Sequence, residues 1–126
     1  MSVLQKLTAR QQKGAQAEQL AQQFLEQQGL QFITKNFRCK QGEIDLIMQD
    51  NDTIVFIEVR HRVRTDFGSA AESVTVSKQT KVIKTATLFM IQQKWYQQKA
   101  VRFDVVTLQG ALLEAPELNW IKQAFY

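Results

Sequence analysis

The chain has 126 residues, which suffices for one domain with a real hydrophobic core and is too short for two. Apolar residues make up 44% and charged residues 22%, a balance typical of a globular protein and not of a disordered or membrane-spanning one. The net charge of +4 permits a polyanionic partner without demanding one. Cys39 is the only cysteine, which excludes an intrachain disulfide and a cysteine zinc cluster. With no signal-peptide pattern at the N-terminus, these features predict a cytoplasmic protein.

The first element expected is a helix over residues 13–28, after a polar, frayed segment 1–12. Its apolar residues recur at helical spacing: Ala17, Leu20, Ala21, Phe24 and Leu25. Gly29 follows as a C′ residue that ends the helix. Glu18 lies at the edge of the apolar stripe, with Gly14 one turn earlier, where a glycine lets another backbone approach closely. The spacing alone makes Glu18 an ordinary boundary glutamate.

A strand over residues 30–37 and a basic turn lead into a β-hairpin formed by residues 42–48 and 53–60. Both hairpin runs are rich in β-branched and apolar residues, and residues 49–52 between them have the composition of a turn. A loop centred on residues 51–52 sets a register that gives the hairpin one wholly apolar face. That face consists of Ile44, Leu46, Met48, Val55, Ile57 and Val59.

The same register places charged residues on the other face of the hairpin. Asp45 is opposite Glu58, and Glu43 is opposite Arg60. Like charges directly opposite one another destabilise a strand pair, so Asp45 and Glu58 need a cation, a proton or exposure to water. One interpretation is a solvated sheet end with an ion pair between Glu43 and Arg60. The other is a divalent-metal site, because hard cations such as Mg²⁺ bind carboxylate oxygens.

Basic residues follow the hairpin in two groups. Residues 61–69 are expected to form a loop beside the charged end of the hairpin, with arginines suited to phosphate contacts. A second helix is expected from a cap at Ser77 to about Lys94. Its apolar face consists of Val82, Ile83, Ala86, Phe89 and Met90, and its basic stripe of Lys78, Lys81 and Lys84. Cations near a helix N-terminus oppose the helix dipole, which is weak evidence for an anionic partner.

The last elements complete the fold prediction. Residues 101–108 are expected to form a strand on which Arg102 pairs with Asp104, and residues 118–125 a short helix that covers an edge of the core. The order is then helix, three strands, helix, strand. Such mixing within one domain predicts a mixed α/β fold with a sheet of three or four strands flanked by helices.

A glutamate on the first helix, an aspartate at a strand end and a Glu-x-Arg on the next strand resemble the signature of PD-(D/E)XK nucleases. More closely, the chain resembles the small bacterial YraN family of proposed endonucleases, which is similar to archaeal Holliday-junction resolvases. The matching stretches are residues 14–18, 36–38, 42–47, 55–60, 67–68 and 102–106. The resemblance implies a restriction-endonuclease-like three-layer core over residues 1–126, with residues 110–126 as a covering segment.

The resemblance also implies a site. Asp45 and Glu58 would bind Mg²⁺ or Mn²⁺, and Glu18 would be a third acidic group reaching the site. Arg60 stands where the superfamily usually has lysine; arginine keeps its proton, so it can only position a phosphate or stabilise charge. The DNA backbone would be held by Arg62, Arg64, Lys78 and Lys81.

The activity implied is metal-dependent hydrolysis of phosphodiester bonds in DNA, including branched or repair intermediates. The implied partner is DNA and not a membrane, and pairing of two copies into a homodimer stays open. Arginine at position 60 keeps a second interpretation open, a non-catalytic nucleic-acid-binding module on a nuclease scaffold. A third is a protein-interaction domain whose acidic cluster has lost its original use.

Overall fold

The fold is described from a computed structural model that covers residues 8–63 and 74–126. The elements in chain order are α1 (Ala9–Gln27), β1 (Gln31–Cys39), β2 (Gly42–Asp50), β3 (Thr53–Arg62), α2 (Val76–Gln92), β4 (Ala100–Gln109), the 3₁₀ helix η3 (Leu112–Glu114) and β5 (Glu117–Phe125). The five strands form one sheet in the order β1-β2-β3-β4-β5. Strands β3 and β4 run parallel, and the other neighbouring pairs are antiparallel. The predicted mixed α/β fold is confirmed.

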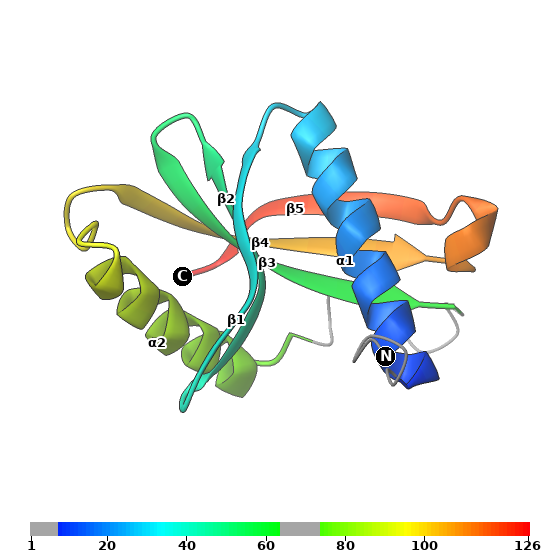
Figure 1. The fold of residues 1–126 in the computed structure, drawn as a ribbon, viewed down its shortest axis with the longest axis horizontal. Helices are drawn as coiled ribbons and strands as arrows, with labels where there is room; N and C mark the ends of the chain where they lie inside the picture. Colours follow the sequence, from blue (N-terminus) through cyan, green and yellow to red (C-terminus); the bar gives the residue numbers. More distant parts are fainter. Residues whose placement is uncertain (1–7, 64–73) are drawn as a thin grey trace, which may run out of the picture.

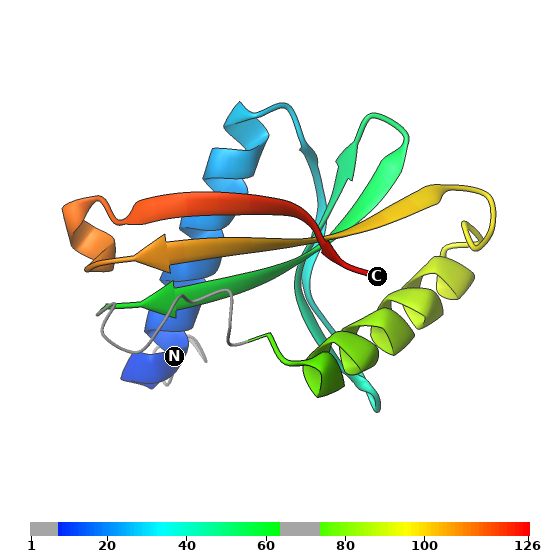
Figure 2. The ribbon, with the colours of Figure 1, turned by 180° about the vertical axis from the view of Figure 1, so that it is seen from behind.

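The two long helices cover opposite faces of the sheet. Figure 1 shows α1 in front of β3, β4 and β5, and Figure 2, from behind, shows these strands in front of α1. One core cluster packs Ala21 and Leu25 of α1 against Leu46 and Ile57. The other, built from α2 and the opposite sheet face, contains Val82, Ala86, Phe89, Met90, Ile47 and Phe56. The parallel pair β3–β4 requires a crossover, and α2 supplies it. Within the described part of the chain, no helix has the length and apolar character needed to cross a membrane.

Helix α1 begins earlier than its apolar period indicates. The Thr8 hydroxyl accepts from the Gln11 backbone N–H at 3.1 Å, and the Gln11 side chain accepts from the Thr8 backbone N–H at 2.9 Å. This capping box fixes the start at Ala9, so the expectation of fraying over residues 9–12 is wrong. At the other end Gly29 has a φ of 100° and donates its N–H to Glu26, which confirms its role as the C′ residue.

The hairpin register is confirmed over the inner part of β2 and β3. Ile47 is opposite Phe56, and the two strands are joined by residues 51–52. The pairing of β2 with β3 ends at Leu46 and Ile57. Beyond it β2 continues with β1 as its partner, with Ile44 opposite Phe37. Ile44 consequently joins the core under α2 and not the face of Leu46, which corrects the prediction of a single apolar face.

Two boundaries of the later elements also differ from the prediction. The cap of α2 is Thr75, whose Oγ1 accepts from the Lys78 backbone N–H at 3.2 Å, and Ser77 lies inside the first turn. The predicted C-terminal helix is wrong, because all of residues 118–125 belong to strand β5. The Arg102–Asp104 pair is confirmed, with Nε 2.9 Å from Oδ1. The buried Asp104 carboxylate also accepts from Trp120 Nε1 and the Gln123 backbone N–H, which fastens β5 to the sheet.

Candidate active site

An open hollow of about 320 Å³ lies where β2 and β3 separate beside the first turns of α2. The two strands stop pairing at Leu46 and Ile57, so the next residues outward, Asp45 and Glu58, line this hollow. The remaining lining residues are Gly42, Glu43, Lys78, Lys81 and Val82. The structure therefore brings together four of the predicted site residues, two carboxylates and two lysines, on β2, β3 and α2.

The two carboxylates differ in how the protein holds them. Asp45 Oδ2 accepts from the Val59 backbone N–H at 2.8 Å, and the Asp45 side chain is 17% exposed. The Glu58 side chain is only 2% exposed, and its Oε2 accepts from Arg60 Nη2 at 2.8 Å. Glu58 Oε1 is buried and has no hydrogen-bond partner among the described residues. A buried carboxylate oxygen without a partner is costly, so a proton or a bound cation at this atom would be stabilising.

Arg60 is the cation that joins the two carboxylates. Its Nη2 contacts Glu58, its Nη1 lies 3.6 Å from Asp45 Oδ2, and Nη1 also donates to the Val59 carbonyl at 3.0 Å. The predicted pair between Glu43 and Arg60 is wrong: Glu43 pairs instead with Arg38, at 2.8 Å on the exposed side of the β1–β2 hairpin. Arg60 is therefore free of Glu43 and directs its charge at the site.

The pKa of Glu58 is raised to about 7, by burial first and by the neighbouring Asp45 second, while Arg60 and Lys78 act to lower it. Burial also raises the pKa of Asp45, against the Val59 hydrogen bond and the charge of Arg60. Ionising both carboxyl groups is therefore unfavourable unless positive charge joins them. Near neutral pH a proton or a cation at the site would relieve this unfavourable charge.

Glu18 reaches the same region from α1. Burial raises the pKa of Glu18 to about 7, with Asp45 as the next cause, and a hydrogen bond with the Asn36 side chain lowers it. Glu18 thus lies within electrostatic reach of Asp45, although it does not line the hollow. Asn36 falls between the paired positions Lys35 and Phe37, so the register of β1 and β2 places it across from Asp45.

Asn36 is a site residue that the sequence analysis did not identify. Its φ is 54°, in the left-handed region that asparagine tolerates better than most residues. This backbone conformation accompanies the hydrogen bond of its side chain with Glu18. Its signal in the sequence is its place in the stretch 36–38 that carries the family resemblance, which gave Asn36 no specific role.

The residues present fit a divalent cation with few protein ligands. Among the described residues, no three His, Cys, Asp or Glu side chains gather closely enough to hold a metal ion. The protein's share would then be two carboxylates, Asp45 and Glu58, and Mg²⁺ is commonly held by one or two carboxylates plus water and substrate phosphate. The buried, partnerless Glu58 Oε1 supplies an oxygen of the kind such an ion prefers.

We expect Mg²⁺ or Mn²⁺ to raise the melting temperature of the full chain. At ten times the dissociation constant, binding to the folded state alone contributes about 1.4 kcal/mol, or a shift of about 3–7 °C for a domain of this size. Asp45→Asn should abolish the shift, because asparagine carries no negative charge to bind the ion. Its side-chain oxygen can still accept from the Val59 backbone N–H, so the fold should be kept. Thermal unfolding with and without the metal tests this. An equal shift in Asp45→Asn would place the ion elsewhere.

The other predicted nucleic-acid contacts are more scattered. Lys78 and Lys81 are exposed and line the hollow, and the charge of Lys78 acts on both carboxyl groups. Arg62 ends β3 beyond the hollow and does not line it. Arg64 lies outside the described residues, as does the matching stretch 67–68.

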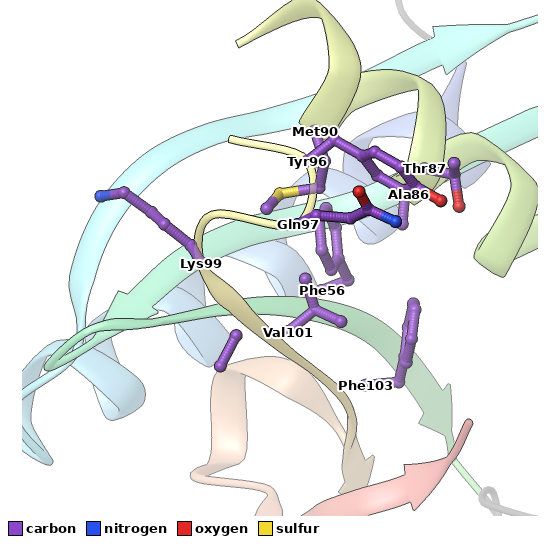
Figure 3. A pocket seen from close by; sticks show the side chains of 10 residues that line it. Phe56, Ala86, Thr87, Met90, Tyr96, Gln97, Lys99, Val101 and Phe103 are labelled. Atoms are coloured by element: carbon purple, nitrogen blue, oxygen red, sulfur yellow. The ribbon is translucent and has the colours of Figure 1, made fainter. Parts of the chain in front are cut away.

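A second cavity of about 300 Å³ lies between α2 and the neighbouring ends of β3 and β4 (Figure 3). Phe56, Met90, Phe103 and Val101 form much of its wall, with Tyr96 and Gln97 at one side. Its lining contains no carboxylate, cysteine or histidine. It therefore offers no carboxylate, thiol or imidazole ligand for a metal ion, and its titratable lining groups are Tyr96 and Lys99.

Comparison with known proteins gives a consistent family pattern. Residues 17–108 match the model of the uncharacterised protein family UPF0102, a span that includes every acidic residue of the site. A UPF0102 protein of Pseudomonas savastanoi pv. phaseolicola is 48% identical over 118 residues, covering 94% of this chain and 96% of that protein. A UPF0102 protein of Herminiimonas arsenicoxydans is 48% identical over 117 residues, covering 93% of this chain and 89% of that protein.

Proposed function

We propose that this chain, which belongs to the uncharacterised protein family UPF0102, is a metal-dependent endonuclease. It would act in the cytoplasm and hydrolyse phosphodiester bonds in DNA. The observation that carries the proposal is the cluster of Asp45, Glu58 and Arg60: two largely buried carboxyl groups with raised pKa values, one partnerless oxygen, and a guanidinium between them. A merely structural ion pair would not require an oxygen without a partner. The resemblance to PD-(D/E)XK nucleases supports the same assignment.

Each residue then has a distinct role. Asp45 and Glu58 would hold the divalent ion, which when bound polarises the scissile phosphate and lowers the pKa of bound water. Arg60 is positioned by Glu58 and the Val59 carbonyl to meet the charge that develops on the phosphate. Lys78 and Lys81 hold the DNA backbone without reading its sequence.

A second candidate function is a nucleic-acid-binding module without catalysis. The specific observation in its favour is that Arg60 already neutralises Asp45 and Glu58 in part, at 3.6 and 2.8 Å, without any metal. Arginine also keeps its proton, so the site lacks the lysine that could lose one in related nucleases. Binding without cleavage is the behaviour that distinguishes this candidate.

The test is a cleavage assay with the purified full chain and Mg²⁺ or Mn²⁺. The substrates are a four-way junction, a flap, a linear duplex, single-stranded DNA and single-stranded RNA of matched sequence. We expect metal-dependent cleavage of DNA, strongest on branched forms, and its loss in Glu58→Gln. Lys99→Gln serves as the control that keeps activity. Lys99 lies on the loop before β4, next to the start of β3 and away from Glu58 along that strand.

The outcomes separate the candidate functions. Binding of DNA by the parent protein without cleavage under either metal would favour the binding module. Neither binding nor cleavage would favour a protein-interaction domain and would overturn the proposal.

A further inference from the structure

A second charged hollow, of about 470 Å³, opens beside the start of α1. It is lined by Ala9, Arg10, Lys13, Gly14 and His61, a set with two cations and no carboxylate. Among the described residues, neither Arg10 nor Lys13 forms an ion pair. Lys13 and His61 also line an adjoining hollow toward η3, where Glu114 brings in one acidic group. The surface at the start of α1 is therefore predominantly basic.

His61 is fixed in the wall of this hollow. Its Nε2 lies 2.7 Å from the Gly110 carbonyl oxygen, which only accepts, so Nε2 carries the proton and donates it. This contact ties the end of β3 to the turn after β4. The ring lies on the α1 side of the sheet, and because β3 continues to Arg62, His61 and Arg62 belong to this strand and not to the predicted loop.

Gly14 is not explained by the packing of the described residues. It lies inside a regular helix, where glycine is less stable than alanine, and its φ is not in the left-handed region. No atom among the described neighbours lies within 4 Å of the place where an alanine Cβ would stand. A bare backbone at the edge of a basic hollow admits a ligand that a side chain would keep away.

The charges at the start of α1 point the same way. Its first turn contains no acidic residue, and Arg10 lies in it with Lys13 following directly. Cations at this end oppose the helix dipole, so their placement is locally unfavourable. An anion bound in the hollow would offset this unfavourable interaction, because it would interact favourably with both the cations and the helix dipole.

Gly14 also lies close to the carboxylate site. It precedes Glu18 by four residues, so the two share one face of α1 and are separated by about 6 Å along the helix axis. Glu18 in turn feels the charge of Asp45.

We infer that the hollow of Arg10, Lys13, Gly14 and His61 binds a backbone phosphate of the DNA strand that reaches Asp45 and Glu58. The inference rests on the proposed function and adds a second phosphate-binding surface, on the opposite flank of the site from Lys78 and Lys81. Arg10 and Lys13 supply the positive charge, and the missing side chain at Gly14 supplies the room.

The test measures folding stability and DNA binding on the same variants. The probe is a fluorescein-labelled four-way junction, with a labelled linear duplex beside it, in EDTA so that no cleavage occurs. Gly14→Ala should raise the melting temperature by about 2–5 °C, because alanine favours the helix. The same substitution should weaken junction binding about tenfold, because its methyl group occupies the approach to the backbone. A glycine that takes no part in DNA binding would give the increase in melting temperature without the loss of affinity.

Lys13→Gln gives an independent measurement. It should weaken binding and reduce the slope of log affinity against log salt by about 0.9 for one lost phosphate contact. Lys99→Gln removes the same charge on the loop before β4 and should leave the affinity and slope unchanged. Tight binding by the parent with unchanged binding by Gly14→Ala and Lys13→Gln would overturn the inference and leave the proposed function standing. Absence of DNA binding by the parent would overturn the inference, and the proposed function falls as well only if the parent also fails to cleave DNA with Mg²⁺ or Mn²⁺.

Discussion

Replacing Arg60 with alanine should lower the rate of DNA cleavage by roughly 10²-fold or more, the usual scale for removing one group that stabilises transition-state charge. Arg60 is suited to this role because Glu58 and the Val59 carbonyl fix its guanidinium beside the carboxylates. Arg60→Lys should keep or raise the rate, because lysine is the common residue at this position in the nucleases that the chain resembles.

The same pair of variants measures the structural role of Arg60. Arg60→Ala removes the hydrogen bond to Glu58 and leaves a buried carboxyl group without a partner, a loss of about 1–3 kcal/mol in the free energy of unfolding. Urea unfolding gives this quantity, and single-turnover cleavage gives the rate per folded molecule. Reduced stability with an unchanged rate per folded molecule would make Arg60 a structural residue only.

Glu58→Gln should stabilise the metal-free protein at neutral and higher pH while abolishing cleavage. The pKa of Glu58 is raised from 4.5 to about 7 in the folded state, so between these values the native protein binds more protons than the unfolded chain. The free energy of unfolding therefore falls as pH rises through this window, by up to about 3 kcal/mol at about 1.4 kcal/mol per unit. Glutamine has no charge to bury, so the free energy of unfolding of Glu58→Gln should not fall in this way.

Urea unfolding in EDTA at each end of that window provides the measurement. The parent and Glu58→Gln should have similar stability at the acidic end, and the variant should be more stable at the alkaline end. Glu26→Gln, an exposed glutamate on α1, is the matched control and should follow the parent. A variant that is less stable than the parent at the alkaline end would show that the ion pair with Arg60 outweighs the burial of Glu58.

The charge of Glu58 therefore has opposite effects on the stability and on the function of the protein. The negative charge that destabilises the metal-free fold is the charge that would bind the ion, so a substitution that removes it gains stability and loses function. Metal should reverse the order, because an ion bound to the folded parent contributes stability that Glu58→Gln cannot gain.

The central part of this site was predictable from alternation along two strands. The period of two over residues 42–60 and the turn at residues 51–52 set a register that brings Asp45 and Glu58 near each other. The partner of Arg60 was not predictable in the same way. Its choice between Glu43 and Glu58 depends on where β2 leaves β3, a property of the twisted sheet and not of either strand alone.

In helix α1, one feature was readable from the sequence but missed, and another was not readable from the sequence pattern. Its start at Ala9 was present in the sequence as Thr8 and Gln11 at capping-box spacing, a signal that the apolar period does not report. The position of Glu18 near Asp45 was indicated only by the resemblance to nucleases, because helical spacing alone marks a boundary glutamate. Its hydrogen bond with Asn36 depends on the packing of α1 against β1, which no local pattern encodes.

The tail was mispredicted for a long-range reason. Leu118 and Trp120 fit a strand as well as a helix, and nothing in residues 118–125 decides between them. The decision comes from Asp104 on β4, which accepts hydrogen bonds from Trp120 and from the backbone of Gln123. Tertiary contacts of this kind override local preference in short segments.

Cleavage of a four-way junction with Mn²⁺ and with EDTA, by the parent protein and by Asp45→Asn, tests the central claim most directly. Asparagine keeps the acceptor for the Val59 N–H, so the variant should remain folded while losing the charge. The account predicts cleavage by the parent only with metal, and none by Asp45→Asn under either condition. Cleavage by the parent in EDTA, or equal cleavage by Asp45→Asn, would contradict it.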